Sequence, residues 1–193
     1  MPALDLTLYR LLNQDFGPAV DAAARLLSNG RFGLLVLSAV VLGVLLPWDR
    51  KRLWLALFLL CSVGLTDLLG ARILKPLFAR PRPIDVLPAG TFRQLVAAAT
   101  GGSMPSLHAA DSFSAAVFLC LVRSSLGIPA LVLATLIALS RVVGGVHWPS
   151  DIVAGASFGT LVSAAVCHGV NRWRRARGEA ELQALSRGLP RSG

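Results

Sequence analysis

Long apolar runs limit what this chain can fold into more than any other feature of its sequence. They cover residues 32–48, 53–74, 105–122, 128–143 and 149–170. About 20 apolar residues in a helix span the hydrocarbon core of a bilayer, where an unpaired backbone polar group is costly. The sequence therefore predicts an all-α, multi-pass transmembrane helical bundle with five spans.

The composition also favours an integral membrane protein. The 193-residue chain is 54% hydrophobic and 15% charged, with a mean hydropathy of +0.65, whereas a soluble domain carries about 25% charged residues. The net charge of +9 could indicate nucleic-acid binding. However, the arginines gather in short loops and in the C-terminal tail beside apolar runs, which favours a role in membrane topology and no nucleic-acid partner.

The N-terminal part of the chain is amphipathic. Its first helical segment, residues 3–16, has an apolar face made of Leu4, Leu8, Leu11 and Leu12. Residues 18–29 repeat the pattern, and helices of this kind lie in the membrane interface. We expect one domain in three parts: amphipathic N-terminal helices over 1–31, a transmembrane core over 32–171, and a basic, flexible cytoplasmic tail over 172–193.

Lysines and arginines near the ends of the apolar runs predict the orientation, because cytoplasmic loops carry an excess of them. With five spans, three basic segments fall on one side: residues 50–52, Arg123 and the start of the tail at 172–177. We expect that side to be cytoplasmic and the other side to be extracytoplasmic. The N-terminus then either crosses the membrane with its arginines or adds a sixth span through residues 17–29.

Three polar clusters lie at run ends on the predicted extracytoplasmic side, and the most informative is Ser140 to Asp151. It carries the pattern R-x5-H-x3-D through Arg141, His147 and Asp151. Pro149 favours the first turn of a helix, which places His147 just before that helix and within reach of Asp151. A carboxylate bonded to one imidazole nitrogen fixes the tautomer and frees the other nitrogen for attack. Taken alone, the pattern fits a helix cap with an incidental histidine equally well.

A stripe of small residues continues below Asp151 at a spacing of four. It consists of Gly155, Gly159 and Ser163. Small residues in such a stripe form a packing seam between membrane helices. We therefore expect this face of the helix to turn Asp151 toward protein.

The second cluster is Pro105 to His108. A helix that starts at this proline offers free backbone N–H groups and a positive dipole end, which bind an anion. Ser106 adds a hydroxyl donor, and His108 can give a proton to a leaving oxygen. Asp111, one turn further on, is expected to hold His108 protonated, although it could also be a polar residue that faces water.

The third cluster, residues 75–83, supplies fixed positive charge through Lys75 and Arg82, and Arg141 adds to it. Catalysis of phosphoryl transfer consists mostly of positioning and neutralising the phosphate oxygens. The planar, permanently charged guanidinium of arginine suits this task. These residues therefore predict a phosphate-binding site at the membrane surface.

Three other charged residues favour structural interpretations. We expect Arg80 to snorkel toward the membrane boundary. Asp67 and Arg72 lie deeper in an apolar run, where ionisable groups are functional candidates. For these two, an ion pair or a structural network is favoured over direct chemistry.

The three clusters together resemble the signature of the type-2 phosphatidate phosphatases, also called lipid phosphate phosphatases. That signature reads K-x6-R-P, P-S-G-H and S-R-x5-H-x3-D. The chain carries, in the same order, Lys75-x6-Arg82-Pro83, Pro105-Ser106-Leu107-His108 and Ser140-Arg141-x5-His147-x3-Asp151. The motifs cover residues 75–151, and the apolar runs extend the likeness to bacterial undecaprenyl-diphosphate phosphatases over most of the chain.

The resemblance implies a role for each residue of the motifs. His147 would be the nucleophile that forms a phosphohistidine, Asp151 would orient it, and His108 would protonate the leaving group. The phosphate would be held by Lys75, Arg82, Ser106 and Arg141. The family needs no metal ion, we expect no cofactor, and the predicted outer loops lack a carboxylate cluster that could hold a metal.

The implied activity is hydrolysis of a terminal phosphate from a lipid phosphate or diphosphate, with undecaprenyl diphosphate as the leading substrate. Leu107 replaces the glycine of the family and resembles relatives that transfer the phosphoryl-bearing group to an alcohol. The alternatives are a phosphatidate, phosphatidylglycerophosphate or lipid A phosphatase, a phosphotransferase to an alcohol, and a non-catalytic lipid-phosphate transporter or scaffold. We expect the protein in the cell (inner) membrane, among membrane lipids, with its site on the extracytoplasmic side.

Overall fold

The computed structural model describes residues 3–46, 50–97 and 101–187. In chain order, its elements are α1 (Ala3–Leu12), α2 (Pro18–Leu27), α3 (Gly30–Leu45), α4 (Arg50–Leu69), the π-helical segment η1 (Gly70–Leu74), α5 (Lys75–Phe78), α6 (Pro83–Val86), α7 (Leu107–Val122), α8 (Ser124–Val143), α9 (Pro149–Ala176) and α10 (Leu182–Arg187). All regular structure in these ranges is helical, so the predicted all-α class is confirmed for them.

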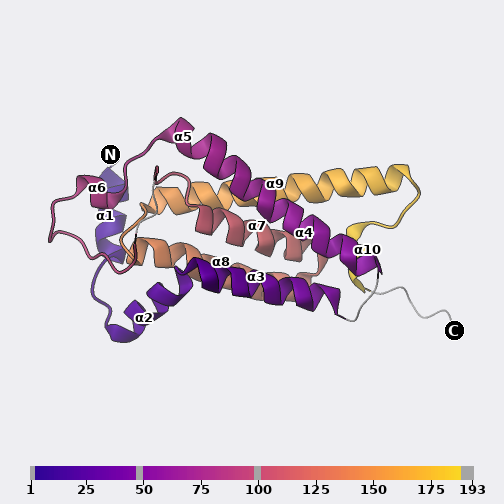
Figure 1. The fold of residues 1–193 in the computed structure, drawn as a ribbon, viewed down its shortest axis with the longest axis horizontal. Helices are drawn as coiled ribbons and strands as arrows, with labels where there is room; N and C mark the ends of the chain where they lie inside the picture. Colours follow the sequence, from indigo (N-terminus) through magenta and orange to yellow (C-terminus); the bar gives the residue numbers. More distant parts are fainter. Residues whose placement is uncertain (1–2, 47–49, 98–100, 188–193) are drawn as a thin grey trace.

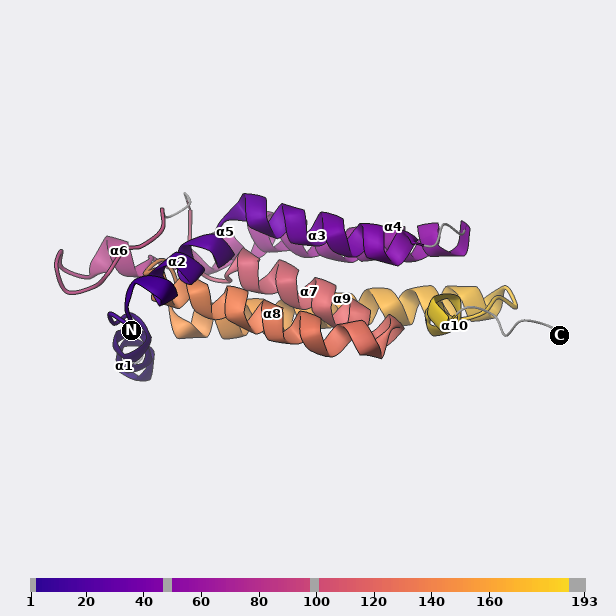
Figure 2. The same cartoon turned by 90° about the horizontal axis from the view of Figure 1, so that it is seen from below.

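The long helices α3, α4, α7, α8 and α9 run side by side along the molecule (Figure 1). Figure 2 shows α3 and α4 as one layer next to a second layer of α7, α8 and α9. Helix α7 contacts α4, α8 and α9 and lies at the centre. One end of the bundle, here called the site end, carries α1, α2, α6 and the α8–α9 turn, whereas α10 lies at the opposite tail end (Figure 1).

Length and composition single out three segments of the described chain that could each cross a membrane: Arg52–Val86, Ser125–Val143 and Pro149–Ala176. A fourth is added if α2 and α3, bent by 64° at their junction, count as one span. Helix α7 is apolar but has only 16 residues. The protein is therefore an integral membrane protein with three to four candidate spans, and the predicted number of five or six is not confirmed.

The predicted and observed helix limits differ most around the first two runs. The first run was expected to end at Trp48, which lies outside the described residues, and α3 ends at Leu45. The second run continues without a break from α4 through η1 into α5, four residues beyond its predicted end at Leu74. Pro76 directly follows the π-helical turn and does not interrupt the helix, which continues to Phe78.

Helices α7 and α9 approach each other closely through small residues. A Cβ atom added at Gly155 would lie 2.4 Å from the carbonyl oxygen of Ser106, and one added at Gly159 would lie 2.0 Å from that of Ala110. Both glycines and Ser163 are buried. The predicted packing seam below Asp151 is thus confirmed, and its partner is the first half of α7.

The segment between α6 and α7 is irregular in its described part. Residues 92–97 form no helix. Backbone groups here bond to the α8–α9 turn instead, since the amide of Leu95 donates to the oxygen of Gly144 at 3.1 Å.

Helix α1 packs against the α8–α9 turn. The ring of Tyr9 is 1% exposed and lies 5.1 Å, centroid to centroid, from the ring of Trp148. The side-chain amide of Asn13 donates to the oxygens of Val142 at 3.3 Å and Val143 at 2.9 Å. These contacts place an N-terminal helix beside the motif that runs from Ser140 to Asp151.

Candidate active site

The three polar motifs meet around a cavity of about 660 Å³ at the site end. Five of the seven predicted site residues line it: Lys75, Arg82, His108, Arg141 and His147. The other two, Ser106 and Asp151, are both 0% exposed. Sequence positions up to 76 residues apart, from Lys75 to Asp151, are therefore brought together as the motifs predicted.

The α8–α9 turn fixes the geometry of His147 and Asp151. Pro149 begins α9, and the Oδ2 atom of Asp151 accepts a hydrogen bond from the backbone N–H of Trp148 at 2.8 Å. The same oxygen lies 3.3 Å from Nδ1 of His147. The carboxylate therefore both caps the helix and meets the imidazole.

The other imidazole nitrogen faces the cavity. Nε2 of His147 lies 3.2 Å from Nη1 of Arg82. A guanidinium can only donate, so Nε2 carries the lone pair and Nδ1 carries the hydrogen that points to Asp151. Burial lowers the pKa of His147 to about 4; the hydrogen bond with Asp151 opposes this shift, and the charge of Arg82 adds to it. The imidazole is therefore neutral at neutral pH.

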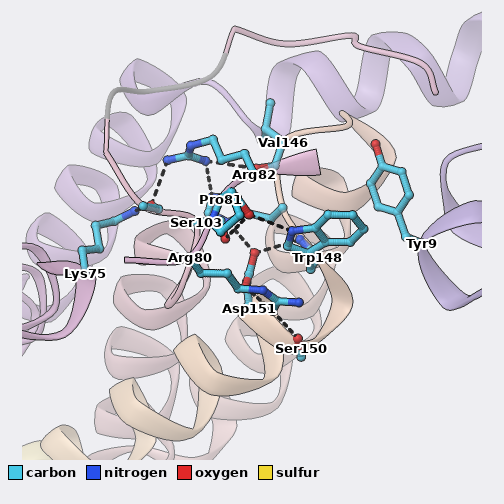
Figure 3. A network of polar contacts seen from close by, with 12 residues as sticks. Tyr9, Lys75, Arg80, Pro81, Arg82, Ser103, Val146, Trp148, Ser150 and Asp151 are labelled. Atoms are coloured by element: carbon cyan, nitrogen blue, oxygen red, sulfur yellow. Dashed lines mark hydrogen bonds and ion pairs between the residues drawn. The ribbon is translucent and has the colours of Figure 1, made fainter. Parts of the chain in front are cut away.

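Arg82 and Lys75 are held by backbone carbonyls of the loops that surround the cavity. Arg82 donates to the oxygens of Val146 at 3.0 Å, Gly101 at 3.2 Å and Gly102 at 3.3 Å. Nζ of Lys75 donates to the oxygen of Gly102 at 2.6 Å. Figure 3 shows both side chains extended toward the same loop. These two cations are thus fixed beside the nitrogen lone pair of His147.

The side of the cavity near His108 has a different character. Four buried polar atoms there have no hydrogen-bond partner among the described residues: Ser106 Oγ, His108 Nε2, Asp111 Oδ1 and Arg141 Nε. Arg141 does donate from Nη1 to the oxygen of Ser28 at 3.0 Å. Buried polar atoms without partners are uncommon and costly in proteins, and they concentrate where a group from outside is bound.

One sequence-based expectation about pairing is wrong, and of the two interpretations favoured for Asp67 and Arg72 only the structural network stays a prediction. Within the described chain, no hydrogen bond or ion pair joins Asp111 to His108. A spacing of three residues on a helix brings side chains near each other but does not fix where their polar atoms point. The described residues also give no ion pair between Asp67, which lines the cavity, and Arg72.

The snorkelling interpretation of Arg80 is also wrong. Its side chain is 15% exposed, and Nη1 donates to Oδ1 of Asp151 at 2.8 Å. Nη2 forms an ion pair with Asp5 of α1. Figure 3 shows the guanidinium of Arg80, which lies between α5 and α6, pointing toward Ser150 and Asp151 at the start of α9. One signal could have indicated this role: the run RPRP places two arginines within one cluster, and only one of them belongs to the K-x6-R-P motif.

The carboxylate Asp5 is a residue that sequence reasoning missed. It is 5% exposed although it lies off the apolar face of an amphipathic helix. Its position depends on Ser150, 145 residues away, whose amide and hydroxyl both donate to it. Across the described residues, no three His, Cys, Asp or Glu side chains come together in a way that could hold a metal ion.

Fold and site together define a class: a membrane-embedded helical bundle with one cavity that is lined by two histidines, two arginines and a lysine. The family model of the PAP2 superfamily matches residues 51–175, which is more than half of the chain and contains all three motifs. The chain therefore belongs to the PAP2 superfamily, a family of lipid phosphatases. The resemblance drawn from the motifs is confirmed.

Known proteins of this family are similar to this chain over much of its length. A decaprenylphosphoryl-5-phosphoribose phosphatase from Mycolicibacterium smegmatis is 34% identical over 146 residues, which cover 72% of each chain. The putative undecaprenyl-diphosphatase YbjG from Escherichia coli is 30% identical over 161 residues, covering 82% of this chain and 78% of its own. The crystal structure of LpxE from Aquifex aeolicus matches with a TM-score of 0.69 at 27% identity, covering 85% of this chain and 94% of that one. Across six curated relatives, the chain spans 46% to 80% of the relative's own length.

Proposed function

We propose that this protein hydrolyses the terminal phosphate of a lipid phosphate or diphosphate through a phosphohistidine at His147. One observation carries the proposal. A neutral imidazole is bonded to Asp151 through Nδ1, and its Nε2 lone pair faces a cavity lined by three cationic side chains. This is the arrangement that makes histidine an oriented nucleophile beside a bound anion.

In the first step, Nε2 of His147 attacks the terminal phosphorus. The bond from phosphorus to the bridging oxygen breaks, and His108 gives its proton to that oxygen as it leaves. The imidazole of His147 becomes positively charged, and Asp151 stabilises it through the Nδ1 hydrogen. The products of this step are the shortened lipid and a phosphoryl group on Nε2.

In the second step, a water molecule attacks the phosphoryl group. His108, now neutral, takes a proton from the water as the phosphorus–nitrogen bond breaks. Inorganic phosphate leaves, His147 returns to its neutral form and His108 is protonated again. Atoms and charges balance without a metal ion or a cofactor, which is the form of mechanism that we propose for this chain.

The phosphate oxygens would be held by four groups. Lys75 and Arg82 enter from one side, next to the lone pair of His147. Arg141 and Ser106 enter from the other, where Nε and Oγ have no hydrogen-bond partner among the described residues. Fixed donors of this kind stabilise charge on the transferred group and cost no reorganisation when it develops.

We infer that the lipid is a polyprenyl phosphate derivative, with undecaprenyl diphosphate as the favoured substrate. The Escherichia coli relative is named for that diphosphate, and the mycobacterial relative is named for a decaprenylphosphoryl sugar phosphate. The mycobacterial relative is 34% identical and the Escherichia coli relative is 30% identical. Because the mycobacterial relative is at least as similar, a polyprenylphosphoryl sugar phosphate is kept as the second candidate substrate. Phosphatidate, phosphatidylglycerophosphate and lipid A are the competing lipids.

Water is the proposed acceptor, and Leu107 bears on that choice. A Cβ atom added at Gly70 would lie 2.6 Å from Cδ2 of Leu107, so the leucine side chain rests against the π-helical segment η1. It lines the cavity on that side. A leucine side chain held against η1 leaves its backbone amide in the place that a glycine would give it, which supports hydrolysis. Transfer to an alcohol is the alternative.

The proposed location is the inner membrane, with the site facing outward. The α7–α8 junction and the C-terminal end of α9 lie at the end of the bundle opposite the α8–α9 turn (Figure 1). Arg123 belongs to that junction, and the basic residues from Arg172 to Arg177 belong to the end of α9. An excess of arginine marks the cytoplasmic side. At the site end, Lys75, Arg82 and Arg141 are accounted for by their proposed task of holding phosphate. Arg80 and Arg93 are accounted for by their ion pairs with aspartates.

The test is phosphate release by the purified protein in detergent, with and without EDTA. The panel contains undecaprenyl diphosphate, a polyprenylphosphoryl sugar phosphate, phosphatidate, phosphatidylglycerophosphate and a lipid A analogue. We expect the fastest release from undecaprenyl diphosphate, no effect of EDTA and no release by a His147→Asn variant. Phosphate release that EDTA abolishes, or that survives in the His147→Asn variant, would contradict the mechanism. If another lipid of the panel is hydrolysed fastest, that lipid replaces undecaprenyl diphosphate as the proposed substrate.

A further inference from the structure

The two oxygens of the Asp151 carboxylate have different partners. Oδ2 accepts from the backbone amide of Trp148 at 2.8 Å and meets Nδ1 of His147 at 3.3 Å. Oδ1 accepts from Nη1 of Arg80 at 2.8 Å. The last torsion of an aspartate side chain is soft, so a partner on each oxygen is what fixes the plane of this carboxylate and keeps Oδ2 turned toward the imidazole.

Arg80 is itself held from several directions. Nη1 also donates to Oγ of Ser150 at 2.6 Å, and Nη2 forms an ion pair with Asp5. The guanidinium lies over the ring of Trp148, 5.5 Å from its centroid. A planar fork with partners at both ends and an aromatic ring below it has one orientation, and Figure 3 shows it between Asp151 and Ser150.

Asp5 anchors this arrangement to α1. Its Oδ1 accepts from the backbone amide of Ser150 at 2.9 Å, and its Oδ2 accepts from the hydroxyl of Ser150 at 2.7 Å. That amide belongs to the first turn of α9, which has free N–H groups and a positive dipole end. Burial raises the pKa of Asp5, but the hydrogen bonds from Ser150 and Arg80 outweigh it and lower the pKa below 3.8. Asp5 is therefore charged at neutral pH.

We propose that Asp5 and Arg80 are positioning residues for the His147–Asp151 pair: Asp5 on α1 sets Arg80, and Arg80 sets the carboxylate that keeps His147 in its Nδ1–H tautomer. Neither residue lines the cavity, so both act through Asp151. The inference rests on the proposed function, because it takes His147 to be the nucleophile. It makes helix α1, which lies outside the matched span 51–175, a working part of the site.

The charges around Arg80 predict what its loss does to the two carboxylates. Arg80 lies between two buried carboxylates, and without it neither Asp5 nor Asp151 keeps a cationic partner in this network. Removing one member of a buried ion pair leaves a charge that is costly to keep. Asp151 would then turn away from Nδ1, or would take up a proton from solvent and donate it to Nδ1. In either case the ring hydrogen moves to Nε2 in part of the molecules, and Nε2 no longer presents its lone pair reliably.

The experiment uses the double variant Asp5→Asn/Arg80→Gln and four single variants of the full chain in detergent or nanodiscs: Arg80→Gln, Arg80→Lys, Asp5→Asn and Asp21→Asn. The last is the matched control. Asp21 on α2 ties the N-terminal helices to the irregular segment between α6 and α7 through Arg93, at 2.7 Å, and the described residues show no bond between Asp21 and Asp151. The readouts are kcat and KM for undecaprenyl diphosphate, the thermal unfolding midpoint, and the tautomer of His147 from 15N chemical shifts of the resting protein.

We expect Arg80→Gln to lower kcat by about 10- to 100-fold, because Asp151, which orients the nucleophile, loses a hydrogen-bond partner. KM should change less than about threefold, because the residues that bind the phosphate are unchanged. Arg80→Lys should restore part of kcat, and Asp5→Asn should lose less than Arg80→Gln. Combining Asp5→Asn with Arg80→Gln should add no further loss, since both act through one contact chain. His147 should show the Nδ1–H tautomer in the wild type and Asp21→Asn, and a mixture in Arg80→Gln.

Each of three results would overturn the proposal. The first is a wild-type kcat in a folded Arg80→Gln variant. The second is an effect of Arg80→Gln on KM alone, and the third is an equal drop in kcat in Arg80→Gln and Asp21→Asn. If Arg80→Gln does not fold, Arg80→Lys and Asp5→Asn carry the same readouts. If the wild type hydrolyses no lipid, the proposed function fails, and the tautomer still decides this inference: a mixture in the variants supports it and an unchanged spectrum overturns it.

Discussion

The two sides of the cavity hold their histidines in opposite ways. On the His147 side, both ring nitrogens have partners, Asp151 at 3.3 Å and Arg82 at 3.2 Å. On the His108 side, Nε2 has no hydrogen-bond partner among the described residues, and the same is true of Ser106 Oγ and Arg141 Nε. One side is fully bonded within the protein, and the other keeps polar atoms unpaired.

This difference separates two tasks. A nucleophile must be fixed before the substrate arrives, because misorientation by about 1 Å costs orders of magnitude in rate. Hydrogen-bond donors stabilise the transferred group most when they bond to that group and have no partner within the protein. We therefore assign preorganisation to the His147 side and recognition of the phosphate and the leaving oxygen to the His108 side. Each of the following changes tests that assignment.

The largest effect is expected for His147→Ala. Removing the nucleophile should lower kcat by at least about 10⁴-fold. The unfolding midpoint should change little, since Arg82 keeps its bonds to Val146 and Gly102. The measurement is phosphate release with thermal unfolding on the same samples. His168→Ala, on the exposed part of α9 near the tail end, is the matched control and should retain full activity; a His147→Ala variant within tenfold of wild type would contradict the account.

A smaller but more informative loss is expected for His108→Asn. Without the proton donor, kcat for a lipid phosphate should fall by about 10²- to 10⁴-fold. An aryl phosphate with an acidic leaving group needs no proton, so its kcat should fall far less. The two kcat ratios are compared on one preparation. Equal losses for both substrates would mean that His108 has another role.

The seam between α7 and α9 sets the distance between the two sides, and Gly159→Ala should widen it. The new Cβ would lie 2.0 Å from the carbonyl oxygen of Ala110, and overpacking of this kind costs about 1–3 kcal/mol. We expect a lower unfolding midpoint and a lower kcat. Gly169→Ala on the same helix, with nothing within 4 Å of its added Cβ, is the control and should change neither. Equal effects of Gly159→Ala and Gly169→Ala would contradict the claim that close packing of α7 and α9 sets the geometry of the site.

The smallest perturbation is a change of pH. Burial lowers the pKa of His147 from 6.5 to about 4, against the opposing bond to Asp151. The folded state therefore binds this proton less well than the unfolded chain, so the contribution of His147 to stability falls as pH drops from 6.5 toward 4. An NMR titration of the ring, assigned with His147→Asn, should give a midpoint near 4. A midpoint at or above 6.5 would mean that the side is not preorganised for a neutral imidazole.

Much of the fold could be predicted because its causes are local. Pro149 starts α9, and Gly155 and Gly159 follow at the spacing that a close helix contact needs. The motifs placed five residues around the cavity from three separate stretches of chain. The number of spans was harder, because an apolar helix of 16 residues surrounded by other helices looks in sequence like one that faces lipid.

The parts that escaped prediction depend on distant partners. Arg80 looked like a residue at a membrane boundary because its two carboxylates lie 75 and 71 positions away. Asp5 sits on an amphipathic helix whose pattern indicates only an interface. The expected bond between His108 and Asp111 failed for a similar reason: helical spacing gives proximity, whereas the direction of polar atoms is set by neighbours on other elements.

The central claim is that phosphate passes through His147. The most direct measurement is to stop the reaction of undecaprenyl diphosphate, labelled in its terminal phosphate, within milliseconds under alkaline conditions, and to locate the label by peptide mass spectrometry. The account predicts an alkali-stable, acid-labile phosphoryl group on the peptide that contains His147, absent from His147→Asn. Turnover with no labelled protein, or with the label on another residue, would contradict it.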